Sequence, residues 1–110
     1  MAKGEHLGEF EQVVLVSLLR LGEGAYGAAI RMEIEAATER SPAIGAVHAT
    51  LERLERKGFI SSWLGDPTSE RGGKAKRHFK VEADGIAALK RSRTMLTRLY
   101  AGLSFRMRLV

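Results

Sequence analysis

The chain has 110 residues, with 18 Lys and Arg against 13 Asp and Glu, a formal net charge of +5 and no cysteine. A chain of this length can bury one modest core as a single domain, and the lack of cysteine excludes disulfides and thiolate metal sites. The net charge is −3 over residues 1–40, +4 over 41–80 and +4 over 81–110. This asymmetry indicates either a polyanionic partner for the later part or only a solvated basic face.

The N-terminus carries no sign of targeting to a membrane. Its first ten residues, MAKGEHLGEF, are charged and lack the apolar run of a signal peptide. The apolar stretch 13–19 is too short to span a bilayer. We therefore expect a cytoplasmic protein that does not interact with membranes.

Residues 7–21 and 28–38 predict two helices joined by a glycine turn. Apolar residues fill most positions of the first segment at helical spacing, which is typical of a helix buried nearly all round. Gly22, Gly24 and Gly27 then predict a turn. Good helix formers follow, with Ile30, Ile34 and Ala37 on one side of the second helix.

The stretch 41–60, SPAIGAVHATLERLERKGFI, predicts a third helix. Ser41 is expected to cap it and Pro42 to occupy its first position. Gly58 is expected to end it in a left-handed turn. The spacing of the apolar residues predicts one buried stripe, made of Ile44, Val47, Leu51 and Leu54.

The opposite face of this third helix is small at its start and positive at its end. Two helices joined by so short a connection predict a helix-turn-helix, and small residues followed by arginines suit a helix in the DNA major groove. His48 lies on the flank between the two faces. The candidate DNA contacts of the recognition helix are Ser41, Gly45, Ala46, His48, Ala49, Arg53 and Arg56.

Residues 59–64 and 76–81 alternate in polarity and predict a β-hairpin directly after the recognition helix. Its loop, GDPTSERGGKA, is rich in turn-forming and basic residues. Three helices and a two-stranded wing make a winged helix-turn-helix, an α+β fold that is mainly α. The candidate DNA contacts of the wing are Arg71, Gly72, Gly73, Lys74, Lys76 and Arg77. The alternative is a flexible, solvated loop. Trp63 is expected to pack against a neighbouring helix.

Residues 85–110 return to helical spacing. About 25 helical residues would run about 38 Å, longer than a small winged domain can cover, so we expect the same helix of a second subunit to pack on it around a two-fold axis. The alternative is that the chain folds back after Gly102 onto its own core. The predicted organisation is a DNA-binding unit, 1–84, and a dimerisation helix, 85–110, in one compact body. The candidate dimerisation residues are Leu96, Leu99, Tyr100, Leu103 and Met107.

Three stretches together resemble the PadR family of winged helix-turn-helix transcriptional regulators, over about residues 7–90: LGEFEQVVLVSLLRLGEGAYGAAI, GAVHATLERLERKGFI and ERGGKAKRHFKVEADGIAAL. The short C-terminal part is similar to the compact branch of the family, which has a single dimerisation helix. The resemblance implies a homodimeric repressor, and because some members release DNA when a small molecule binds near the dimer interface, a small-molecule effector is a candidate partner. The family usually carries a tyrosine where this sequence has His48, which implies a different operator preference.

The sequence offers no catalytic set, cofactor motif or metal motif. Its three histidines, His6, His48 and His78, have no metal-ligand spacing, and Gly72-Gly73-Lys74 lacks the other residues of a phosphate loop. We therefore predict a regulator that binds double-stranded DNA at a palindromic operator, and not an enzyme. The alternative is a winged helix that binds another protein, but such a surface should expose large apolar residues.

Overall fold

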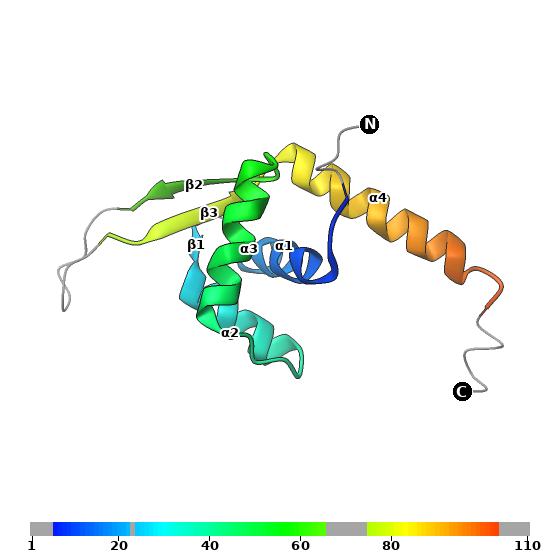
Figure 1. The fold of residues 1–110 in the computed structure, drawn as a ribbon, viewed down its shortest axis with the longest axis horizontal. Helices are drawn as coiled ribbons and strands as arrows, with labels where there is room; N and C mark the ends of the chain where they lie inside the picture. The colour runs from blue at the N-terminus through cyan, green and yellow to red at the C-terminus, as the bar shows by residue number, and fades with distance from the viewer. Residues whose placement is uncertain (1–5, 23, 66–74, 104–110) are drawn as a thin grey trace.

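The computed structural model describes residues 6–22, 24–65 and 75–103, which form four helices and a three-stranded sheet (Figure 1). The elements in chain order are α1 (Glu9–Leu21), β1 (Ala25–Tyr26), α2 (Gly27–Ala37), α3 (Ile44–Arg56), β2 (Ile60–Leu64), β3 (Arg77–Val81) and α4 (Ala83–Tyr100). The predicted class, a mainly helical winged helix-turn-helix, is confirmed.

The core lies where the first three helices meet the base of the sheet. The helices α1, α2 and α3 contact one another in all three pairs, and α1 also contacts β3. Val47, Leu51 and Leu54 are buried, so this part of the predicted stripe of α3 is confirmed. Gly58 has a φ of 80°, as expected for the residue that ends this helix. The other buried apolar residues are Val14, Leu15, Leu18, Ala25, Ile30, Ile34, Phe59, Ile60, Phe79 and Ala88.

The sheet is antiparallel and its strand order is β1-β3-β2. Strands β2 and β3 form the predicted hairpin, with Trp63 opposite His78. The third strand, β1, was not predicted: residues 22–27 were expected to form only a turn. It contains two residues, Ala25 and Tyr26, too few to produce an alternating pattern. Its pairing attaches the wing to the segment that precedes α2.

The start of α3 differs from the prediction. The helix begins at Ile44 with Ala43 as its N-cap, because Ser41 and Pro42 are engaged elsewhere. The Ser41 hydroxyl donates to Glu35 Oε2 over 2.9 Å, and the Pro42 carbonyl accepts a 2.8 Å hydrogen bond from Arg31 Nε. Ser41 therefore closes the turn between α2 and α3 and does not cap α3. Ile44, at the first helical position, is 41% exposed and does not extend the buried stripe.

The fourth helix is shorter than expected. It has 18 residues and ends at Tyr100, so it is about 27 Å long and not about 38 Å. Ala101 leaves the helical conformation and Gly102 has a φ of 82°. Residues 104–110, which include Met107, lie outside the described residues, and so does any return of the chain after Gly102. As Figure 1 shows, α4 runs away from the wing and extends beyond the three-helix core.

The sequence predicted that helix α1 is buried nearly all round, and this prediction is wrong. Val16 and Leu19 are 45% and 47% exposed, because the side of α1 that they occupy faces α4 across an open groove. Within the described residues, no helix combines the length and the apolar character needed to cross a membrane.

Candidate nucleic-acid interface

The first half of α3 presents small side chains to solvent. Gly45, Ala46 and Ala49 are exposed, and a Cβ atom placed on Gly45 would meet nothing within 4 Å. His48 is exposed beside them. The buried side of the helix is held by Val47, Thr50, Leu51 and Leu54. The described part of this face can therefore approach a flat or grooved surface with little steric hindrance.

The sequence prediction missed Glu52, which is exposed on the same face. It follows Gly45 by seven residues and Ala49 by three, so the helical repeat places it in the same row. No ion-pair partner of Glu52 is found among the described residues. The helical spacing that identified the small residues could also have identified this carboxylate, which lies between Ala49 and Arg56 in that row.

Arg53 and Arg56 lie in different surroundings. Arg53 Nε is 3.5 Å from Glu11 Oε2 of α1, and its Nη2 donates to Thr50 Oγ1 over 3.2 Å. Arg56 is exposed, and the described residues provide no ion pair for it. Of the two arginines, Arg56 is therefore the one whose guanidinium is available to an external phosphate.

Glu11 is a buried carboxylate that connects the start of α1 to the end of α3. Its oxygens accept hydrogen bonds from the Gly8 amide (2.8 Å) and from Lys57 Nζ (2.9 and 3.0 Å). Burial raises the pKa of this carboxyl, but the Gly8 amide, the Lys57 ammonium and Arg53 outweigh it and hold the pKa below its ordinary value of 4.5. Lys57 and Arg53 thus stabilise the position of α3 on α1.

The wing is described only at its base. Arg71, Gly72, Gly73 and Lys74 lie outside the described residues, whereas Lys76 and Arg77 lie within them. Lys76 Nζ is 4.2 Å from the centre of the Tyr26 ring. Arg77 is exposed and its Nη1 donates to Ser62 Oγ over 3.0 Å. Both cations therefore lie at the base of the wing, which follows the recognition helix in the chain.

His78 holds the base of the wing against the segment before α2. Its ring stacks on Trp63, with centroids 5.9 Å apart and planes at 25°, and meets the Tyr26 ring edge-on at 6.0 Å. Its Nδ1 forms a hydrogen bond with the Gly24 carbonyl, so Nδ1 carries the proton. Trp63 was expected to pack against a helix, but its stacking partner is this histidine on the neighbouring strand.

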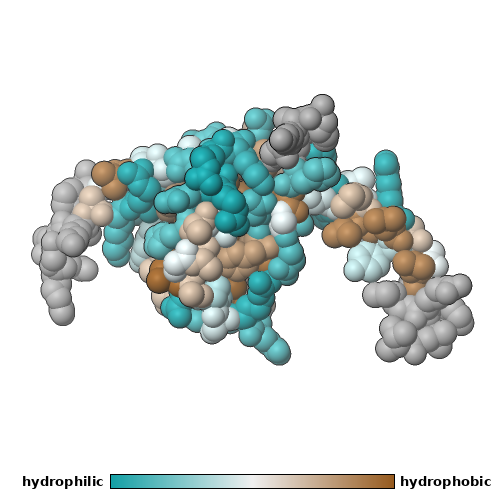
Figure 2. Space-filling model, viewed as in Figure 1, coloured by the Kyte–Doolittle hydropathy of each residue, from teal (hydrophilic) through white to brown (hydrophobic). Residues whose placement is uncertain are grey.

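Of the predicted dimerisation residues, Leu96, Leu99 and Tyr100 lie on α4, away from the wing. Leu103 follows the helix, and Met107 lies outside the described residues. Leu96, Leu99, Tyr100 and Leu103 are all at least 39% exposed, and Figure 2 shows apolar residues gathered on this part of the molecule.

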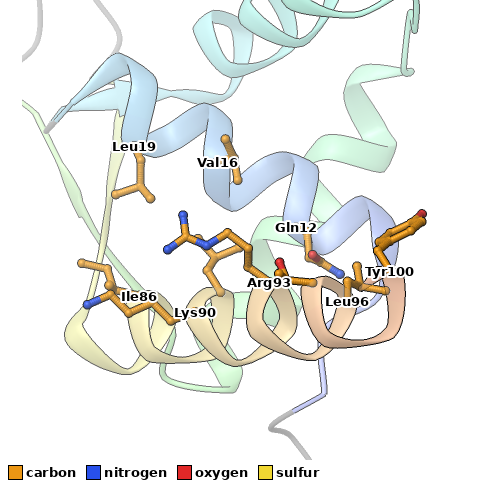
Figure 3. A pocket seen from close by; sticks show the side chains of 10 residues that line it. Gln12, Val16, Leu19, Ile86, Lys90, Arg93, Leu96 and Tyr100 are labelled. Atoms are coloured by element: carbon orange, nitrogen blue, oxygen red, sulfur yellow. The ribbon is translucent and has the colours of Figure 1, made fainter. Parts of the chain in front are cut away.

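Between α1 and α4 lies a half-open groove of about 560 Å³. In Figure 3, Val16 and Leu19 of α1 point toward α4, and Arg93 points toward α1. The groove is mainly apolar, with cationic side chains from Lys90 and Arg93.

No protein-family model matches the sequence, and a search of curated proteins finds no significant match. Solved structures do match. A PadR-family transcription regulator from Clostridium difficile gives a TM-score of 0.70 over 89% of this chain and 98% of that chain, at 17% identity. A PadR-family regulator from Eggerthella lenta gives 0.69 over 90% and 86%, at 20% identity.

Bacillus subtilis PadR in complex with operator DNA gives a TM-score of 0.61 over 74% of this chain and 44% of that chain, at 19% identity. The fold is thus shared with transcription regulators of the PadR family, as the sequence resemblance implied. At these identities the likeness concerns the fold.

Proposed function

We propose that the protein is a sequence-specific DNA-binding transcriptional regulator. The observation that carries this proposal is the exposed row of Gly45, Ala46 and Ala49 on α3, beside a wing whose described base carries Lys76 and Arg77. A helix face without bulky side chains can enter the major groove, and the exposed cations Arg56, Lys76 and Arg77 suit the phosphates that border it. The shared fold with a regulator solved on its operator DNA supports the proposal.

Within this interface each predicted contact has a distinct role. Gly45, Ala46, His48 and Ala49 would face base edges, and Arg56 would bind a phosphate. Arg71, Gly72, Gly73, Lys74, Lys76 and Arg77 would contact phosphates or the adjacent minor groove from the wing. Arg53 and Ser41 would act at its border, since both side chains have partners within the protein.

We further propose that the protein is a homodimeric repressor in the cytoplasm. Residues 1–84 would bind DNA, and residues 85–110 would dimerise through Leu96, Leu99, Tyr100, Leu103 and Met107. The exposure of the first four of these side chains supports the proposal. A two-fold dimer would present two α3 helices to half-sites of a palindrome about 34–36 Å apart. The groove between α1 and α4 is the candidate site for a small-molecule effector.

The test is a gel-shift experiment with the protein and its own upstream DNA over a series of salt concentrations. Specific binding should weaken steeply with salt, because Lys and Arg displace counterions. Arg56→Ala and the double variant Lys74→Ala/Arg77→Ala should weaken binding to all sequences and flatten the salt dependence. If no DNA shifts at low salt, the protein would instead be a winged helix that binds another protein.

A further inference from the structure

Gly27 and His48 meet where α2 begins. Gly27 is the first residue of α2 and is buried, whereas His48 lies one turn into α3 and is exposed. A Cβ atom on Gly27 would lie 2.6 Å from Cε1, 3.2 Å from Nε2 and 3.4 Å from Nδ1 of His48. The imidazole therefore occupies the space that a side chain at position 27 would need.

The backbone itself does not require glycine at position 27. The described glycines with positive φ are Gly22, Gly24, Gly58 and Gly102, and Gly27 is not among them. Alanine is also the better helix former at such a position. The three atoms nearest to a Cβ at this site all belong to His48. Glycine at position 27 therefore permits the close contact with the His48 ring.

The His48 side chain does not contribute to the hydrophobic core. Its side chain is exposed, and the described residues give it no hydrogen-bond partner. A ring that rests on the first turn of α2 has fewer orientations than a free exposed side chain. Cε1 and both ring nitrogens are the atoms of His48 that lie nearest to Gly27. The two nitrogens, one donor and one acceptor when the ring is neutral, point to either side of this contact, from a residue that is exposed on the face we assign to DNA.

We infer that Gly27 is a positioning residue for His48, and that the positioned imidazole is a specificity-determining group of the interface. This inference rests on the proposed DNA-binding function. A ring held in place before binding loses less rotational freedom when it contacts a base edge. The contact also fixes the directions in which its two nitrogens donate and accept, which favours one arrangement of acceptors and donors in the groove.

A double-mutant cycle tests the pair. Four proteins are titrated against the operator and against a scrambled duplex of the same length at one salt concentration. They are wild type, Gly27→Ala, His48→Ala and Gly27→Ala/His48→Ala. Gly27→Ala should displace the ring and weaken operator binding about five- to tenfold, with little change on the scrambled duplex. In the His48→Ala background, the same Gly27→Ala change should alter operator affinity less than about twofold.

Two further measurements separate positioning from folding. Urea unfolding should show that Gly27→Ala is at least as stable as wild type, because an exposed ring can move aside. The NMR resonance of His48 Cε1–H should shift in Gly27→Ala in the absence of DNA. Equal losses of operator affinity in both backgrounds, or no loss in either, would overturn the inference while leaving DNA binding in place. Failure of wild type to bind any duplex would overturn the proposed function and this inference with it.

Discussion

Glu52 places a carboxylate in the middle of the α3 face that the proposed function directs at DNA. A carboxylate is repelled by phosphates but can accept a hydrogen bond from the amino group of cytosine. Glu52→Gln should therefore raise affinity for unrelated DNA about two- to fivefold and raise operator affinity less. The ratio of the two affinities, measured by fluorescence anisotropy with competitor DNA, should fall.

Asp84→Asn is the matched control, because Asp84 is exposed in the first turn of α4 and its replacement changes the net charge by the same amount. It should leave the ratio of affinities unchanged. If Glu52→Gln and Asp84→Asn had equal effects on both DNAs, Glu52 would contribute only to the overall charge.

Glu11 makes the stability of the protein depend on pH. Its pKa is lowered in the folded state, so its contribution to stability is complete above the ordinary value of 4.5 and is lost as the pH falls through the lower, folded pKa. Glu11→Gln should lower the free energy of unfolding at pH 7 by about 1–3 kcal/mol, because Lys57 loses its charged partner. The difference from wild type should shrink below pH 4.5.

Urea unfolding of both proteins from pH 7 to pH 3 measures this difference. Glu39→Gln serves as the control, since Glu39 is exposed in the turn between α2 and α3, and it should change stability by less than about 0.5 kcal/mol. A constant gap between Glu11→Gln and wild type across the whole pH range would show that the charge of Glu11 does not matter.

At the scale of elements, the wing depends on His78 for its attachment to β1. His78→Ala removes the stack on Trp63, the edge contact with Tyr26 and the hydrogen bond to Gly24. We expect a loss of about 1–2 kcal/mol of stability. Trp63 is the only tryptophan of the chain, so its fluorescence reports on the wing alone: the emission should shift to the red and acrylamide quenching should increase.

His48→Ala provides the comparison for this experiment, because it removes an exposed histidine from α3, and it should leave the emission of Trp63 unchanged. Were His78→Ala to leave both emission and quenching as in wild type, the cluster around His78 would not determine how the wing is held.

The regular elements could be predicted from the sequence because each has an internal period or a terminal residue of its own. The buried stripe Val47, Leu51 and Leu54 marks α3, Gly58 marks its end, and alternation marks β2 and β3. Strand β1 has no such pattern, since it exists only by pairing with β3. The end of α4 was placed too late because its apolar spacing continues past the point where the chain leaves the helix at Ala101.

The side-chain contacts of the candidate site were harder to predict than the fold. A helical wheel gives the direction of a Cβ atom, and long or aromatic side chains then reach partners that are distant in sequence. Arg53 reaches Glu11, 42 residues away, and His78 reaches Gly24, 54 residues away. The short side chains of Gly45, Ala46 and Ala49 cannot turn back in this way, so their exposure was predicted correctly.

At the scale of the whole molecule, the basic charge is divided between two surfaces. The charge asymmetry of the sequence suggested one polyanion-facing side, but the described residues place Lys90, Arg91, Arg93 and Arg98 on α4, away from the wing (Figure 1). Those four cations border the apolar residues proposed for dimerisation. Of the cations in the described residues, Arg56, Lys76 and Arg77 lie on the proposed DNA face, with Arg53 at its border. The net charge therefore overstates the charge available to phosphates there.

The proposed assembly can be tested with two apolar residues of nearly equal exposure. Leu99 on α4 is 65% exposed and Met32 on α2 is 64% exposed, so neither supports the fold of the single chain. Leu99→Asp should produce a monomer, because a charge would be buried without a partner in the interface. Met32→Asp should leave the assembly unchanged. Light scattering on a size-exclusion column measures both masses.

The same variants connect assembly to DNA binding. A dimer engages both half-sites at once, so loss of the second contact should weaken operator binding by at least about a hundredfold, while binding to an isolated half-site should change little. Met32→Asp should bind both DNAs like wild type. If Leu99→Asp remained a dimer, or if it became a monomer that still bound the full operator with wild-type affinity, α4 would not be the element that brings two recognition helices onto one palindrome.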